Sequence, residues 1–229
     1  MFKTLLGLIV LFSITACGGG GGGSSGPVAS TSAFPLRQAN INSFVAGTTN
    51  FTLSGTYSNA QASGSGTETD SALTSGTFEG ISGFQQTTNT SLTIIAGGVS
   101  TPSTSVSTSW FDTNYNPIGV TGDEYVVIDQ PVGQLPVAAH VNDTGTWLTA
   151  KRYSDSTKAT LNGTTTITYK LNADTATTAL LSLIRVDKDN SGALISTETQ
   201  VYRITPTGSQ TLLTDTLVET GTSLVFTYQ

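Results

Sequence analysis

The sequence has little charge, and its basic residues are the scarcer kind. Lys and Arg number 9 and Asp and Glu number 15 among 229 residues, which makes 10% charged residues and a net charge of −6. Proteins that bind nucleic acid hold its phosphates with a basic surface. We therefore expect no nucleic-acid partner.

The sequence also has one cysteine and one histidine, Cys17 and His140. A single cysteine forms no internal disulfide, and the two residues together cannot make a zinc site of His and Cys ligands. A Ser-His-Asp triad would have to use His140 as its base. That histidine lies in a proline- and glycine-rich stretch, 129–145, where we expect a solvated loop residue, so we predict no catalytic residues.

No apolar run is long enough to cross a membrane as a helix. The run Leu5–Ile14 has about ten residues, whereas a helix spanning the ~30 Å of hydrocarbon needs about 20. Lys3 precedes it, and a short positive segment followed by such a run is typical of a secretory signal.

The four residues that end this signal, ITAC at 14–17, resemble the lipobox of bacterial lipoproteins. The resemblance implies that residues 1–16 are a cleaved signal peptide and that Cys17 carries a diacylglycerol, with an acyl chain such as palmitate on its amino group. Gly18, where retained lipoproteins have Asp, implies sorting to the outer membrane. The alternative is an ordinary secreted protein cut after Ala16, which would leave Cys17 as an exposed thiol with no structural use.

Six glycines, 18–23, follow Cys17 directly, and residues 17–33 therefore predict a lipidated cysteine with a flexible Gly/Ser tether. A coil of this length spans roughly 20–25 Å. Such a tether would hold a folded body away from the bilayer.

The rest of the chain alternates apolar and polar residues with the period of a β-strand. In 164–171, Ile167, Tyr169 and Leu171 share one face, and in 223–228 Leu224, Phe226 and Tyr228 do. The segment 179–186 is apolar on both faces and predicts a central strand. Turn residues recur between these segments. We predict an all-β fold, an antiparallel meander forming a β-sandwich or a strongly curved half-barrel, with little or no helix outside the signal peptide.

The predicted organisation is a first β half at 34–130, a crossover or linker at 131–145 and a second β half at 146–229. Two prolines and two glycines in 129–145 mark this boundary. The segment 58–76, rich in Gly, Ser and Thr, predicts an exposed hairpin or partial disorder. The sequence leaves open whether the halves form one domain.

The motif DKDNSGALISTE, 187–198, matches the spacing of an EF-hand calcium loop. Asp187, Asp189, Ser191 and Glu198 occupy positions 1, 3, 5 and 12, and Gly192 occupies position 6. The flanking segments read as strands, however, so we favour a hairpin with its tip at 190–192 over a calcium site. No other cofactor is indicated.

Five residues make up the aromatic-rich spots, and if exposed they would suit contact with a glycan or a protein. Core packing is the interpretation we favour. The five are Trp110, Phe111, Tyr115, Trp147 and Tyr153.

These observations favour an outer-membrane lipoprotein acting as a non-enzymatic binding or structural module of the cell envelope. Its partners would be the membrane, through the lipid, and an unidentified protein or glycan ligand. The alternative is a periplasmic carrier or chaperone that holds an apolar ligand in a curved sheet. A secreted hydrolase using two carboxylates is less favoured. The sequence leaves open whether the protein faces the periplasm or the cell exterior.

Overall fold

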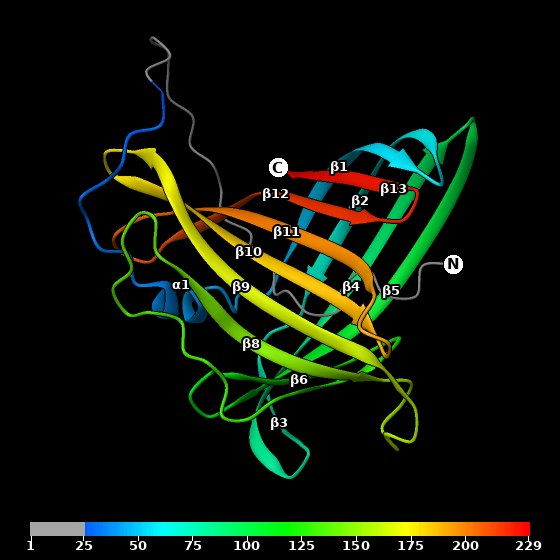
Figure 1. The fold of residues 1–229 in the computed structure, drawn as a ribbon, viewed down its shortest axis with the longest axis horizontal. Helices are drawn as coiled ribbons and strands as arrows, with labels where there is room; N and C mark the ends of the chain where they lie inside the picture. Colours follow the sequence, from blue (N-terminus) through cyan, green and yellow to red (C-terminus); the bar gives the residue numbers. More distant parts are fainter. Residues whose placement is uncertain (1–25) are drawn as a thin grey trace.

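The computed structural model describes residues 26–229, which form one short helix and thirteen β-strands (Figure 1). The predicted signal peptide, Cys17 and the glycine run lie outside the described residues. The elements in chain order are α1 (Leu36–Asn42), β1 (Gly47–Tyr57), β2 (Ala60–Asp70), β3 (Thr74–Phe78), β4 (Ile81–Ala96), β5 (Val99–Asp112), β6 (Pro117–Thr121), β7 (Tyr125–Ile128), β8 (Thr144–Tyr153), β9 (Leu161–Thr175), β10 (Thr178–Asp189), β11 (Leu194–Ile204), β12 (Gln210–Glu219) and β13 (Thr222–Tyr228).

Twelve of these strands form a closed antiparallel barrel. From β4 to β13 each strand pairs with the next along the chain, as expected of a meander. The hairpin β1–β2 then closes the ring, because β1 pairs with β13 and β2 pairs with β4. The short strand β3 pairs with the other part of β4, beside the end of β2.

The structure confirms the all-β antiparallel fold with little helix, and it corrects the predicted shape. A sandwich or a half-barrel would leave open edges, whereas here Phe51 of β1 lies opposite Tyr228 of β13 and no edge remains in the ring. The segment 58–76 contributes a regular hairpin. Of the predicted crossover or linker at 131–145, residues 131–143 connect β7 and β8, which are neighbours in the sheet.

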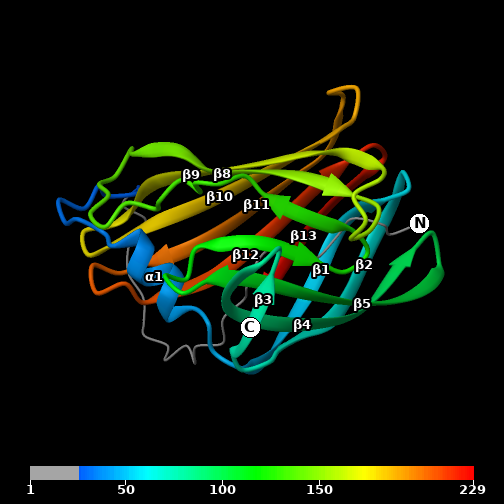
Figure 2. The ribbon, with the colours of Figure 1, turned by 90° about the horizontal axis from the view of Figure 1, so that it is seen from below.

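The two ends of the barrel differ, and we call them the tether end and the hairpin end. The tether end carries α1, the loop 129–143 and the turn between β9 and β10, and the hairpin end carries the turns 58–59, 97–98 and 190–193 (Figures 1 and 2). The chain leaves toward its N-terminus at the tether end, where the N–H of Val28 donates to the carbonyl of Asp174 at 3.1 Å.

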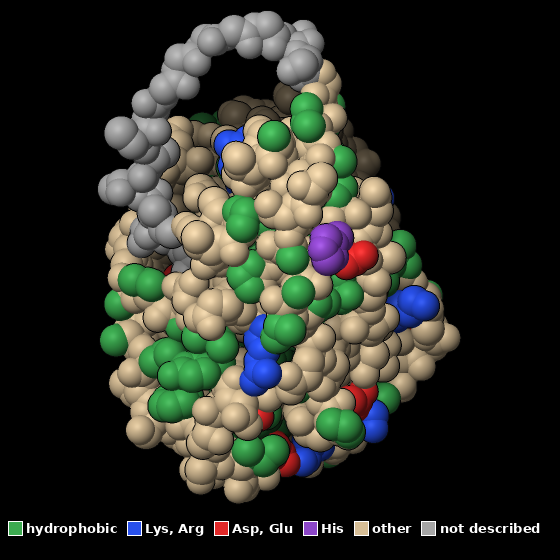
Figure 3. Space-filling view, turned by 90° about the vertical axis from the view of Figure 1, so that its left-hand side faces the viewer, with side chains coloured by type: hydrophobic (Ala, Val, Ile, Leu, Met, Phe, Trp, Pro, Cys, Tyr) green, Lys and Arg blue, Asp and Glu red, His purple; other side chains and the backbone are tan. Residues whose placement is uncertain are grey.

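The helix and the long loop cover the tether end. Phe34 and Ala139 exchange two backbone hydrogen bonds of 2.8 and 2.9 Å, which fix the loop against the residues before α1. Leu36 and Leu135 are buried at this end. Figure 3 looks onto it and shows mostly uncharged side chains with scattered charges. Among residues 26–229, no helix is long and apolar enough to cross a membrane.

Apolar side chains inside the barrel form two separate clusters. The larger one lies toward the tether end and includes Leu171, Leu181 and Ile204; the smaller one lies toward the hairpin end and includes Leu217 and Phe226. The outer face of β1 is polar instead: its exposed positions are Thr48, Asn50, Thr52 and Ser54. The alternation predicts that six residues face inward. Ile167, Leu171, Leu224 and Phe226 are buried, and Tyr169 and Tyr228 are partly buried.

Candidate functional site inside the barrel

A belt of charged side chains lies on the inner wall of the barrel, between the two apolar clusters. On β12, for example, Asp215 is buried between Leu212 of the larger cluster and Leu217 of the smaller one. Buried charges are rare in proteins and are paired or neutralised when they occur. The members of the belt are Glu68, Asp70, Glu124, Arg152, Arg185, Asp187, Glu198 and Asp215.

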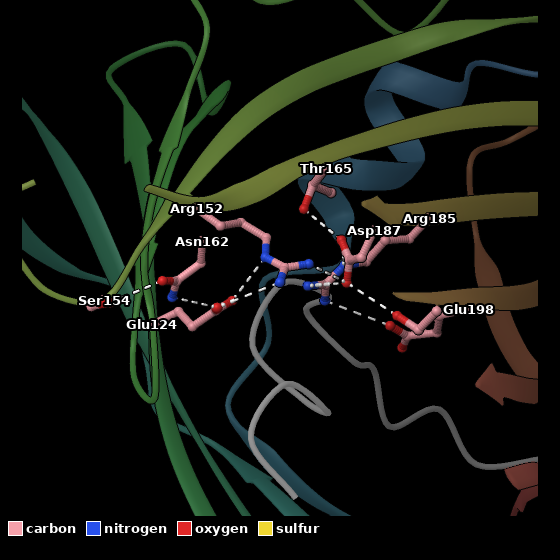
Figure 4. Close-up of polar contacts among 9 residues, drawn as sticks. Glu124, Arg152, Ser154, Asn162, Thr165, Arg185, Asp187 and Glu198 are labelled. Atoms are coloured by element: carbon pink, nitrogen blue, oxygen red, sulfur yellow. Dashed lines mark hydrogen bonds and ion pairs between the residues drawn. The ribbon is translucent and has the colours of Figure 1, made fainter. Parts of the chain in front are cut away.

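Two arginines neutralise one side of the belt (Figure 4). Arg185 contacts both oxygens of Asp187, at 3.1 and 2.9 Å, and reaches Glu198 at 3.6 Å. Arg152 forms ion pairs with the same Asp187, at 3.3 Å, and with Glu124, at 2.9 Å. Asp187 thus lies between two guanidinium groups that are almost fully buried. Attraction at such distances is strong away from water, and it offsets the large desolvation penalty of these charges.

Neutral side chains complete the bonding of these carboxylates. The Thr165 hydroxyl donates to Asp187 at 2.5 Å, and Ser196 donates to its other oxygen at 3.3 Å. Asn162 donates to Glu124 at 2.9 Å. The donors come from β9 and β11, the two strands that pair with β10. The sheet register therefore brings these side chains close to the carboxylates.

The other side of the belt is acidic without a matching cation. Glu198 and Asp215 share a side-chain hydrogen bond, and Gln200 donates to Asp215 at 3.4 Å. Burial, and then the charge of Glu198, raises the pKa of Asp215 well above its usual range. Burial also raises the pKa of Glu198, although Arg185 opposes the shift. The shared hydrogen bond and the raised pKa values both favour a protonated form of this pair.

Glu68 and Asp70 of β2 extend the acidic side. Burial, followed by the charges of Asp70 and Glu198, raises the pKa of Glu68 well above the ordinary value. Burial raises the pKa of Asp70 to about 6. The hydrogen bond of 2.6 Å that Thr88 donates to Asp70 lowers this pKa but does not cancel the effect of burial. No arginine or lysine of residues 26–229 forms an ion pair with Glu68, Asp70 or Asp215.

Three buried oxygens on this acidic side lack a hydrogen-bond partner in the described part of the chain. They are Oε1 of Glu68, Oε1 of Gln86 and Oδ1 of Asp215. All three are acceptors, and their residues are 2%, 0% and 4% exposed. Because a buried acceptor without a donor is costly, an arrangement of this kind calls for an explanation. The acidic side can accept hydrogen bonds from a bound molecule.

We predict that Asp70→Asn stabilises the protein above pH 6 and not below pH 4. Because the folded-state pKa of Asp70, about 6, exceeds its ordinary value of 3.8, wild-type stability falls as the pH rises between these values. Asparagine carries no charge and still accepts the bond from Thr88. The expected gain above pH 6 is on the order of 2 kcal/mol, or about 5 °C in Tm. Thermal melts of both proteins across this pH range check it, and a difference that does not change with pH would contradict it.

The structure separates the four residues considered for calcium. Asp187 and Glu198 are buried on the inner wall, whereas Asp189 and Ser191 belong to the turn between β10 and β11. Asp189 Oδ1 accepts the N–H groups of Ser191 at 2.8 Å and Ala193 at 2.9 Å, which makes it a turn-forming side chain. In residues 26–229 no cluster of three or more His, Cys, Asp or Glu suits a metal ion. The strands β10 and β11 pair on either side of the turn 190–193, as in the favoured hairpin.

We predict that calcium does not stabilise the protein. Asp187 is already bound by two arginines, and the turn carboxylate of Asp189 is used by backbone N–H groups. The measurement is the Tm in millimolar calcium and in chelator, which should agree. A rise in Tm that depends on calcium concentration would show a site at this motif.

The remaining residues considered from sequence lie apart from the belt. Cys17 is outside the described residues, and His140 is exposed in the loop at the tether end. The aromatic residues are at least partly buried. Trp110 stacks on Phe78 at 5.6 Å outside the barrel wall, and Tyr115 stacks on Phe84 at 5.1 Å.

Sequence reasoning missed the belt itself, and one of its members carried a visible signal. Arg185 follows Leu181 and Leu183 at the strand period, so it belongs to the same inward face. The segment 179–186 was expected to be apolar on both faces, and the structure corrects this: the inner face turns from apolar to charged at Arg185. Glu68 and Asp70 had no such signal, because their segment looked like an exposed hairpin.

No family model, curated protein or solved structure matches this chain. The functional assignment therefore rests on the motif at the N-terminus and on the geometry of the belt.

Proposed function

We propose that this protein is a lipid-anchored, non-enzymatic binding module of the outer membrane that holds a polar ligand inside its barrel. The observation that carries the proposal is the set of unpartnered acceptors, Glu68 Oε1 and Asp215 Oδ1, buried among carboxyl groups with raised pKa values. Such groups cluster at functional sites more often than elsewhere. A ligand that donates hydrogen bonds would satisfy them.

The arrangement of the barrel ends supports an anchored role. The predicted tether, 17–33, joins the body at the covered end, where Val28 pairs with Asp174. Lipid at Cys17 would then leave the hairpin end free of the membrane and open to the surroundings.

The alternative role, carriage of an apolar ligand, fits the inner wall less well. An apolar molecule long enough to contact both apolar clusters would lie across Arg185, Asp187 and Asp215 and would remove any remaining water from them. Desolvation of charges without new partners is unfavourable. We therefore favour a polar ligand.

The hydrolase alternative has one observation in its favour, the hydrogen-bonded pair Glu198 and Asp215. A glycoside hydrolase needs one carboxyl group to stay ionised beside a protonated one, with the scissile bond between them. Here the two carboxyl groups hydrogen-bond to each other, so they do not flank a scissile bond. We favour binding over hydrolysis.

Native mass spectrometry of the mature protein tests the proposal. The protein is extracted gently from its own membranes, and its mass is compared before and after unfolding. The proposal predicts a small molecule that stays bound to the folded protein and is released on unfolding. A folded protein that carries only its covalent lipid, from cells grown in rich and in minimal medium, would contradict a ligand-filled barrel.

A further inference from the structure

We infer that the barrel binds a small aliphatic diammonium ion, with its ammonium groups against Glu68 and Asp215. This inference rests on the proposed function, since it names the chemical class of the ligand. Four observations lead to it: the excess of carboxyl groups, the kind of atom left unpartnered, the apolar surface beside these atoms and the two tyrosines near them.

The belt contains six carboxyl groups and two guanidinium groups. Arg152 and Arg185 are occupied by Glu124, Asp187 and Glu198. The other three carboxyl groups belong to Glu68, Asp70 and Asp215, which form no ion pair with any residue of 26–229. A ligand with two positive charges would compensate most of this excess.

The unpartnered atoms on the acidic side of the belt all require a donor. Two further buried atoms without a hydrogen bond, Nε and Nη1 of Arg152, lie within ion-pair distance of Glu124 and Asp187. Oε1 of Glu68, Oδ1 of Asp215 and Oε1 of Gln86 are oxygen acceptors in side chains more than nine-tenths buried. An ammonium group offers three N–H donors and no acceptor, as the lysine side chain does. A metal ion fits less well, because in the described chain no three potential ligands are grouped around one point.

Glu68 and Asp215 are close enough to influence one another, yet they come from different parts of the wall. The charge of Glu68 contributes to the raised pKa of Asp215. Their strands, β2 and β12, are separated in the sheet by β1 and β13. The register places Asp215 level with Gly64 of β2, and Glu68 lies four residues further along that strand. Three strand spacings of about 4.8 Å across the wall and four residues of about 3.3 Å along it place the two backbones roughly 20 Å apart, and both side chains point inward. Two ammonium groups on a short chain suit this separation better than one.

The smaller apolar cluster lies beside this pair, toward the hairpin end. Leu217 follows Asp215 on the inner face of β12, and the ring of Phe51 lies over Gly66, two residues before Glu68. Any Cβ at position 66 would lie 2.4 Å from that ring, so the glycine lets it cover the wall there. Methylene groups between two ammonium groups would pack on this surface.

Two tyrosines complete the surroundings. The charges of Asp215 and Glu68 add to burial in raising the pKa of Tyr202 and Tyr228 well above the usual range, so both phenols lie near the acidic pair. The Tyr202 hydroxyl donates to Gln200 at 2.5 Å, which in turn donates to Asp215. Aromatic rings beside carboxylates are a common environment for bound organic cations.

The test uses the mature lipidated protein in non-ionic detergent and 1,4-diaminobutane as the probe. At pH 8 we expect saturable binding by calorimetry, a rise in Tm with probe concentration, and at least tenfold weaker binding of n-butylamine. Sodium chloride of equal ionic strength should not reproduce the rise. Because the ammonium groups favour the ionised form of carboxyl groups whose pKa values are raised by burial, binding should also release protons, measured from the binding enthalpy in buffers of different ionisation enthalpy.

Two variants locate the site, and a third is their matched control. Glu68→Gln and Asp215→Asn should each weaken binding at least tenfold. Asp123→Asn removes the same charge from an exposed position at the hairpin end and should bind as the wild type does. If a substitution impairs folding, the proton-release measurement still tests the inference, because it uses the wild-type protein alone.

Either of two results would overturn the inference: no saturable binding by the wild type, or equal weakening in all three variants, which would mean attraction to the acidic surface alone. These failures are distinct from failure of the proposed function. A different molecule retained in native mass spectrometry would leave the binding module standing and would remove only the diammonium assignment.

Discussion

Replacing Arg185 by methionine should lower the free energy of unfolding by about 3–5 kcal/mol, or about 10 °C in Tm. Methionine keeps much of the side-chain volume but leaves Asp187 with one arginine and Glu198 with none. Both carboxyl groups are nearly inaccessible to water, so their lost partner is not replaced. Chemical denaturation at pH 7 with a fluorescence readout measures the loss.

The matched control is Arg203→Met. Arg203 bonds Asp174 at 2.7 Å, but its side chain is 49% exposed, so we expect a loss of no more than about 1 kcal/mol. The loss in Arg185→Met should shrink at low pH, where protonation neutralises the orphaned carboxylates. Equal losses in the two variants would contradict the assignment of the belt as a buried ion-pair network.

Replacing Cys17 by serine should release the protein from the membrane completely. By its resemblance to a lipobox, the motif would make the Cys17 sulfur the attachment point of the lipid, and serine offers no thiol. A tether of glycine and serine has no membrane affinity of its own, because it contains no apolar face. Fractionation of cells, with blotting for the protein, should show the wild type in the outer membrane and the variant absent from it.

Ser24→Ala is the control, since it changes the same tether by a similar amount without touching the lipid site. It should stay in the outer membrane. If Cys17→Ser also stays there, the protein is held by another contact and the lipidated tether is wrong. Protease treatment of intact cells would then show, for the wild type, whether the barrel faces the exterior or the periplasm.

The local pattern of the sequence predicts the strands well, because the alternation of apolar and polar residues along a strand can be recognised from neighbouring residues alone. Leu224 and Phe226 share one face of 223–228, and both are buried inside the barrel. The closure of the barrel is different. It depends on pairing of Phe51 with Tyr228, near opposite ends of the chain, and nothing local to either residue marks the other as its partner.

The charged belt was harder to predict than the apolar clusters for a related reason. A charged residue in a strand is expected on the solvent face, and only its position relative to apolar neighbours, as for Arg185 after Leu183, reveals an inward direction. Whether the inward position is tolerable depends on partners from other strands, such as Glu198 and Arg152. Those partners become visible only once the register between strands is known.

The same limit explains the calcium motif. The spacing of 187–198 matches a loop that wraps around an ion, but a strand pair places alternate residues on opposite faces. Asp187 and Glu198 therefore point into the barrel, and Asp189 remains in the turn. Spacing alone does not distinguish the two geometries.

The most direct test of the account's central claim is the mass of the N-terminal tryptic peptide of the protein from membranes. The first basic residue after Cys17 is Arg37, so trypsin should release residues 17–37 as one peptide. The account predicts this peptide with a diacylglycerol on Cys17 and an acyl chain on its amino group. An unmodified Cys17, or a mature chain that begins at another residue, would contradict the lipid-anchored module.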